Sequence, residues 1–184
     1  IGALATFLIV AVQGKLSWNV FTRSVYHTAR LGSMVLWIII GCLAFSTVVN
    51  SLALPAFLTG VIESIGLNPW MVLIGMMISL FILGMLMDDL PIIMITAPIY
   101  VPIVTHLGFD PLWYGILFIL NMQMAYLTPP FGFVLFYMKG VVPPEITMGD
   151  IYKSVGPFVV LQAIGLIIVM LFPQIALWLP SFIN

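Results

Sequence analysis

The stretch that decides how this chain is interpreted runs from Asn121 to Gly132 and reads Asn-Met-Gln-Met-Ala-Tyr-Leu-Thr-Pro-Pro-Phe-Gly. It lies inside an apolar segment, Pro111 to Lys139, yet it contains two amides, a hydroxyl, two prolines and a glycine. Proline has no backbone N–H, so Pro129 and Pro130 cannot continue a helix from the residues before them. The sequence therefore predicts a break in this helix, with unpaired carbonyls near residues 125–128.

A break of this kind has two interpretations. An unpaired backbone group in hydrocarbon is costly unless it faces a cavity, an ion or other protein. Secondary transporters use such breaks as sites, with freed carbonyls for cations and helix N-termini for anions. The alternative is a proline kink that neighbouring helices repair. The motif Thr-Pro-Pro-x-Gly beside Asn121 and Gln123 favours a binding site.

The composition is that of an integral membrane protein. Hydrophobic residues make up 63% of the chain, charged residues 6%, and the mean hydropathy is +1.26. A net charge of −1 provides no basic face for nucleic acid. The single cysteine, Cys42, lies in an apolar run and excludes a disulfide framework.

Hydrophobicity and punctuation divide the chain into segments. The stretch Leu31 to Ile62 contains no charged residue. It is too long for one untilted span and too short for two full spans with a loop. Its polar centre favours a re-entrant hairpin over one long tilted span whose Ser and Thr bond back to their own helix. We expect the following order: the end of a truncated transmembrane helix (1–14), an interfacial amphipathic arm helix (15–30), a re-entrant helical hairpin (31–66), transmembrane helices (69–87 and 90–107), a broken transmembrane helix (111–139), a polar loop with a short helix (140–154) and a C-terminal transmembrane helix (155–180).

Local signals refine these segments. Asn68-Pro69 predicts a helix start, as do Thr147 and Asp150. In the span after Asn68, Gly75 and Gly84 predict close helix packing. Of the adjacent acids that follow this span, we expect Asp89 to cap the next helix and Asp88 to be the functional candidate. Both histidines, His27 and His106, are expected to be interfacial.

Three motifs, in this order and spacing, resemble a known family. They are Gly84-Met85-Leu86-Met87-Asp88, then Asp110-Pro111-Leu112-Trp113-Tyr114-Gly115, then Leu127-Thr128-Pro129-Pro130-Phe131-Gly132. Together they resemble the C-terminal half of the large membrane subunit of tripartite ATP-independent periplasmic (TRAP) transporters. The resemblance implies an all-α integral membrane fold that is one inverted repeat of an elevator-type transporter, with a re-entrant hairpin and a broken helix.

The resemblance also implies a function and partners. Such transporters lie in the bacterial inner membrane and take up organic acids, such as dicarboxylates or sialic acid, together with sodium ions. A soluble periplasmic substrate-binding protein delivers the substrate, and a small TRAP membrane subunit completes the complex in the lipid bilayer. Sodium is a coupling ion here, and no other metal or cofactor is expected.

Carried over onto this sequence, the resemblance assigns residues to two roles. The expected sodium-binding residues are Ser46, Thr47, Asn50, Gly84, Asp88, Thr128 and Pro129. The expected substrate-facing residues are Asn121, Gln123, Pro130 and Gly132. Because no Arg or Lys lies at membrane depth, helix N-termini after Pro55 and Pro130 would supply part of the positive field for an acid.

Other classes of function were weighed. A stand-alone ion-coupled carrier or antiporter would have the same broken helix and would use Asp88 and Asp89 to carry protons or sodium. An intramembrane enzyme is disfavoured because the spans contain no Ser/His, His/Glu or paired-acid constellation, so no catalytic residue is predicted. A purely structural scaffold would leave the polar breaks unexplained.

Overall fold

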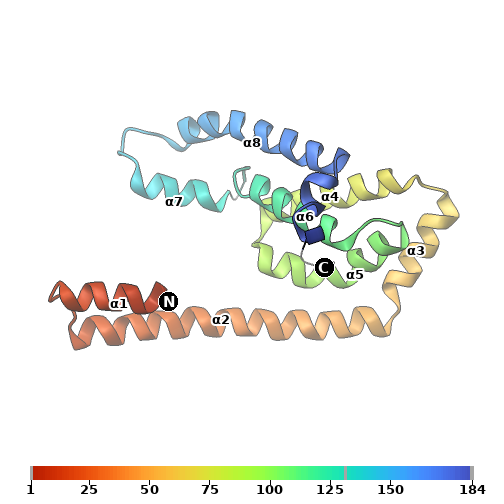
Figure 1. Ribbon diagram of the computed structural model, residues 1–184. Coiled ribbons are helices and arrows are strands. Elements are labelled where there is room, and N and C mark those ends of the chain that lie inside the picture. Colours follow the sequence, from red (N-terminus) through yellow and green to blue (C-terminus); the bar gives the residue numbers. More distant parts are fainter. Residues whose placement is uncertain (1, 131, 183–184) are drawn as a thin grey trace. The chain divides into compact units, whose positions relative to one another are not determined.

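The computed structural model describes residues 2–130 and 132–182 (Figure 1). Within these residues, all regular secondary structure is helical. The chain divides into two compact units, the first ending at Gly41 and the second beginning at Cys42. One continuous helix, α2, contributes residues to both units.

The first unit contains α1 (Gly2–Val12) and the first part of α2 (Trp18–Ser51). The turn between them uses Gly14 in the left-handed conformation, with φ 67°. The Ser17 Oγ accepts a hydrogen bond from the Val20 N–H at 3.2 Å and so caps the start of α2. The rings of Phe7 and Phe21 meet edge to face across α1 and α2, 6.2 Å apart.

Helix α2 joins two segments that the sequence separated, the arm helix at 15–30 and the first half of the hairpin at 31–66. No proline or glycine pair interrupts it, and most of its hydroxyl side chains donate to carbonyls one turn earlier. Near its end, Thr47 Oγ1 donates to the Leu43 carbonyl at 2.9 Å and Ser51 Oγ to the Thr47 carbonyl at 2.7 Å. Such bonds satisfy polar side chains within their own helix, so these side chains need no partner from another helix.

The second unit contains the end of α2 and the remaining helices: α3 (Leu54–Ile65), α4 (Pro69–Leu86), α5 (Asp89–His106), α6 (Pro111–Ala125), α7 (Phe133–Val141), α8 (Met148–Leu171), α9 (Gln174–Leu177) and the 3₁₀ turn η1 (Pro180–Phe182). Ala53, with φ 49°, caps α3 after a tight turn from α2. Helix α3 packs on α5, and α7 packs on α8.

The predicted helix starts at Asn68 and Thr147 are confirmed. The Asn68 side chain accepts from the Trp70 N–H, and Thr147 and Asp150 form a reciprocal capping box. This box starts α8 at Met148, inside the expected polar segment 140–154. Helix α8 then ends at Leu171, before Pro173, so the expected span 155–180 contains parts of α8, α9 and η1.

Helix α6 is the centre of the second unit. It contacts α4, α5, α8 and α9 (Figure 1). Its buried residues cover one broad side of the helix, whereas Leu112 and Ile119 on the opposite side are exposed. The buried residues are Trp113, Tyr114, Leu117, Phe118, Asn121, Met122, Met124 and Ala125.

The start of α6 is fixed by the Asp-Pro-Leu-Trp motif. Asp110 Oδ1 accepts hydrogen bonds from the N–H groups of Leu112 and Trp113, at 2.7 and 3.1 Å. The Trp113 ring packs near Phe109 and Trp70, and its Nε1 donates to the Val169 carbonyl of α8 at 2.9 Å. The motif therefore joins α4, α6 and α8.

Among the residues that the structure describes, four helices are long and apolar enough to cross a membrane: α2, α4, α5 and α8. This result confirms the predicted all-helical membrane class.

The join at Trp113 gives a stability prediction. Trp113→Phe removes a buried hydrogen bond and leaves the Val169 carbonyl without it, so the free energy of unfolding should fall by about 1–2 kcal/mol. Trp70→Phe is the matched control, because Trp70 is 41% exposed and donates no side-chain hydrogen bond to a described residue. Unfolding of the purified protein in detergent measures both changes. Equal losses in the two variants would contradict the account.

Candidate functional site

Helices α4 and α6 approach most closely at Gly84. A Cβ built on Gly84 would lie 2.7 Å from the Ala125 Cβ and 3.2 Å from the Met122 sulfur. The predicted close packing is thus confirmed at Gly84. It is wrong at Gly75, where a Cβ would meet no described atom within 4 Å. The contact at Gly84 brings the end of α4 against the end of α6.

The acids that follow α4 start the next helix. Asp88 is the N-cap of α5, and its Oδ1 accepts a hydrogen bond from the Asp89 N–H at 3.1 Å. The prediction that Asp89 is the cap is wrong, because Asp89 is already the first helical residue. An acid at either place interacts favourably with the positive end of α5. The functional candidate Asp88 therefore has a capping role as well.

Tyr126 connects these acids to the end of α6. Its hydroxyl accepts from the Asp89 N–H at 3.1 Å and donates to Asp88 Oδ1 at 3.4 Å. Tyr126 is 37 and 38 residues away from the two acids in sequence. The sequence analysis did not single it out, although a tyrosine hydroxyl inside an interrupted apolar helix was a usable signal.

The backbone between α6 and α7 is partly unpaired. The N–H groups of Tyr126, Leu127 and Thr128 donate to the carbonyls of Met122, Met124 and Ala125. The Ala125 carbonyl loses its helical partner because residue 129 is proline, and it accepts instead from the Thr128 N–H at 3.0 Å, in a tighter turn. The carbonyls of residues 126–128 accept no hydrogen bond from the residues that the structure describes.

We call this assembly the α4–α6 junction and define it as residues 84–89 together with residues 122–128. It contains two carboxylates, a phenol and three carbonyls without a described partner. The surrounding sequence from 31 to 138 contains no Lys or Arg, whereas it contains Glu63, Asp88, Asp89 and Asp110. Electrostatically, such a region attracts cations rather than anions. Within the described residues, no group of three His, Cys, Asp or Glu side chains could hold a metal.

The structure places the other expected site residues as follows. Thr128 is half-buried, and its Oγ1 donates to the Met124 carbonyl at 2.9 Å. Gln123, Pro129 and Pro130 are exposed, and Gly132 is buried with φ 37°. The three expected hairpin residues lie at the end of α2, where no hydrogen bond to the α4–α6 junction is found among the described residues: Ser46 is half-buried, and Thr47 and Asn50 are exposed.

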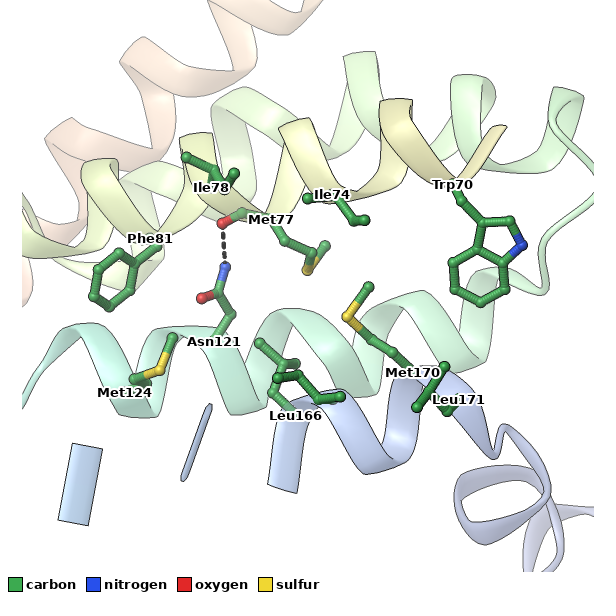
Figure 2. Close-up of a pocket in the computed structure, with 11 residues that line it drawn as sticks. Trp70, Ile74, Met77, Ile78, Phe81, Asn121, Met124, Leu166, Met170 and Leu171 are labelled. Atoms are coloured by element: carbon green, nitrogen blue, oxygen red, sulfur yellow. Dashed lines mark hydrogen bonds between the residues drawn. The ribbon is translucent and has the colours of Figure 1, made fainter. Parts of the chain in front are cut away.

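Asn121 is the residue directly before the α6 part of the junction, and it lies against α4. It is 1% exposed, and its Nδ2 donates to the Met77 carbonyl at 2.7 Å (Figure 2). It borders a cavity of about 430 Å³ between α4, α6 and α8 that is otherwise lined by apolar side chains. The Oδ1 is fully shielded and has no partner among the described residues. In this arrangement Asn121 joins two helices.

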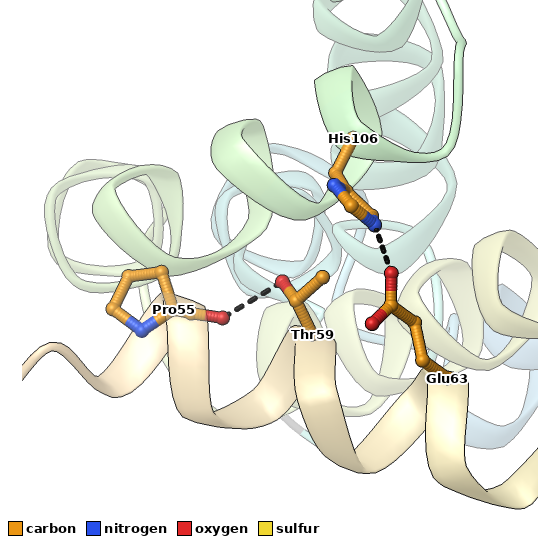
Figure 3. Close-up of polar contacts among 4 residues, drawn as sticks. All are labelled: Pro55, Thr59, Glu63 and His106. Atoms are coloured by element: carbon orange, nitrogen blue, oxygen red, sulfur yellow. Dashed lines mark hydrogen bonds and ion pairs between the residues drawn. The ribbon is translucent and has the colours of Figure 1, made fainter.

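A polar pair also joins α3 and α5. His106 Nε2 and Glu63 Oε1 are 2.7 Å apart, and both side chains are largely exposed (Figure 3). Nearby, Thr59 Oγ1 donates to the Pro55 carbonyl of its own helix (Figure 3). An exposed pair of this kind contributes little to stability.

These features define a class of protein: a multi-pass helical membrane protein with two acidic side chains where α4 and α6 meet. The family model described as "Tripartite ATP-independent periplasmic transporter, DctM component" matches residues 1–175. The chain belongs to this family of TRAP transporter large permeases. The family consists of transporters, which agrees with the prediction that the chain is not an enzyme.

Several curated relatives are similar over nearly the whole chain. A C4-dicarboxylate TRAP transporter large permease protein of Pseudomonas aeruginosa is 30% identical, over 98% of this chain and 42% of the relative. A sialic acid TRAP transporter large permease protein of Vibrio cholerae is 30% identical, over 96% and 41%. A 2,3-diketo-L-gulonate TRAP transporter large permease protein of Escherichia coli is 25% identical, over 100% and 44%. The chain thus spans less than half the length of these relatives.

The contact at Gly84 gives a second prediction. Gly84→Ala forces α4 away from α6, and overpacking of this kind should cost about 1–3 kcal/mol of unfolding free energy. Gly75→Ala, in the same helix, meets open space and should gain up to about 1 kcal/mol from helix propensity. Thermal unfolding of the purified full-length subunit compares the two.

A double variant checks the cause. Adding Ala125→Gly to Gly84→Ala removes the methyl group that the new Cβ meets, so the two changes should be less costly together than their sum. Additive losses, or equal effects of Gly84→Ala and Gly75→Ala, would refute close packing at this point.

Proposed function

We propose that this chain is part of the large permease of a sodium-coupled secondary transporter for organic acids. The observation that carries the proposal is the α4–α6 junction, where Asp88 meets the end of α6 and the carbonyls of residues 126–128 accept no hydrogen bond from the described residues. Carboxylate and carbonyl oxygens suit a hard cation, and unwound carbonyls coordinate sodium in other secondary transporters. Gly84, Asp88, Thr128 and Pro129 belong to or border this junction.

The remaining parts of the site complete the proposal. The end of α2, the turn at Ala53 and α3 would form a re-entrant hairpin whose tip carries Ser46, Thr47 and Asn50 toward the junction. Helices α6 and α7 would be the two halves of a broken transmembrane helix. Gln123, Pro130 and Gly132, with Asn121 behind them, would face the substrate. The unit would then move as one repeat of an elevator.

Substrate and partners follow from the family. The relatives are named for C4-dicarboxylates, sialic acid and 2,3-diketo-L-gulonate, which are all organic acids. A tripartite transporter implies further components. We propose a periplasmic substrate-binding protein that delivers the acid and a small membrane subunit that completes the complex in the bacterial inner membrane.

Uptake into proteoliposomes tests the function. The full-length large subunit is reconstituted with its small subunit, and radiolabelled succinate, sialic acid and 2,3-diketo-L-gulonate are offered in turn. Each is offered with an inward sodium gradient or a matched potassium gradient, with and without the binding protein. We expect uptake of at least one acid that needs both the sodium gradient and the binding protein.

Two results would contradict the proposal. Uptake driven by an ion gradient without any binding protein would favour a stand-alone carrier or antiporter, with Asp88 and Asp89 as its coupling residues. Uptake that is equal in sodium and potassium would remove the sodium site from the α4–α6 junction.

A further inference from the structure

Tyr126 is the side chain that links the two halves of the α4–α6 junction. Its hydroxyl lies between Asp88 Oδ1, at 3.4 Å, and the Asp89 nitrogen, at 3.1 Å, and the same nitrogen is 3.1 Å from Asp88 Oδ1. The three groups form a closed triangle of hydrogen bonds. These contacts place Asp88 Oδ1 beside the Tyr126 hydroxyl at the start of α5.

The triangle uses only one oxygen of Asp88. All hydrogen bonds to this carboxylate go to Oδ1, and Oδ2 accepts none from the described residues. A carboxylate whose first oxygen is held by donors presents its second oxygen in a defined direction. Ordering the ligand before the ion arrives lowers the conformational cost of binding.

The backbone of Tyr126 belongs to the same place. Its carbonyl is the first of the three, at residues 126–128, that accept no hydrogen bond from a described residue. Tyr126 therefore connects the two groups. Its main chain carries one of the carbonyls without a described partner, and its hydroxyl contacts the Asp88 carboxylate.

We propose that Tyr126 is a positioning residue for cation binding, whose hydroxyl holds Asp88 in register with the carbonyls of residues 126–128. This inference rests on the proposed sodium-coupled function. Tyr126 acts through Asp88 and the backbone, and its hydroxyl already has a donor and an acceptor in the triangle. Loss of the hydroxyl frees the carboxylate to rotate and uncouples the end of α6 from the start of α5.

A second tyrosine provides a matched control. Tyr100 of α5 shares a hydrogen bond of 2.8 Å with Ser79 of α4, so it also joins two helices through its hydroxyl. Among the described residues, its side chain forms no hydrogen bond with a residue proposed for the ion. Tyr100→Phe and Tyr126→Phe make the same chemical change, and a general loss of interhelical bonding would affect both variants alike.

The test uses the full-length large subunit with its small subunit and binding protein in proteoliposomes. Uptake of the transported acid is measured against sodium concentration and against acid concentration. Tyr126→Phe should raise the sodium concentration for half-maximal uptake by about fivefold, the effect of one net hydrogen bond. At saturating sodium, the KM for the acid should stay within about twofold of the wild-type value. Tyr100→Phe should leave the sodium dependence unchanged.

A binding readout serves if uptake by the variant is too weak to measure. Relative to potassium, sodium should raise the thermal unfolding midpoint of the purified wild-type subunit and of Tyr100→Phe. Tyr126→Phe should need about fivefold more sodium for the same rise in midpoint. A wild-type sodium response in Tyr126→Phe, or the same shift in both variants, would overturn the positioning role.

The result also separates this inference from the function on which it rests. Wild-type uptake that does not respond to sodium would overturn the proposed function, and the role of Tyr126 with it. Wild-type uptake that depends on sodium, with an unaltered half-saturation in Tyr126→Phe, would overturn the role of Tyr126 alone.

Discussion

The contact between Gly84 and Ala125 is the constraint on which the arrangement of the site depends. Any side chain at residue 84 would meet Ala125 at a distance that real Cβ atoms do not adopt, so only glycine lets α4 reach the end of α6. Asp88 is four residues further along and Tyr126 is the residue after Ala125. Their meeting follows directly from the close approach of the two helices. The same contact therefore packs α4 on α6 and brings Tyr126 to Asp88.

Much of the fold could be predicted because its causes are local. Helices are indicated by apolar runs and by side-chain hydrogen bonds to the nearby backbone, as at the cap at Asn68 and the capping box at Thr147. The continuity of α2 from the expected arm helix into the following apolar stretch was less visible, because the two stretches differ in polarity although no proline separates them. Helix α2 then ends at Ser51 and α3 begins at Leu54, so the chain turns inside the expected segment 31–66.

The site was predictable in parts. The proline pair indicated where one helix ends, since proline blocks the backbone whatever the tertiary structure, and α6 ends at Ala125 before the pair. The sequence could not place Asp88 beside Tyr126, because 38 residues separate them and only the packing of α4 on α6 brings them together. It also could not show that the Ala125 carbonyl is paired, because the bond from Thr128 depends on how the chain turns after α6.

The central claim is that sodium binds where the end of α4 meets the end of α6. Hydrogen–deuterium exchange of the full-length subunit, compared in sodium and in potassium, tests it without any substitution. The account predicts that sodium slows exchange in peptides that contain residues 84–89 and 126–132, because a bound ion holds both segments together. Slower exchange only in other segments, or no difference between sodium and potassium, would contradict it.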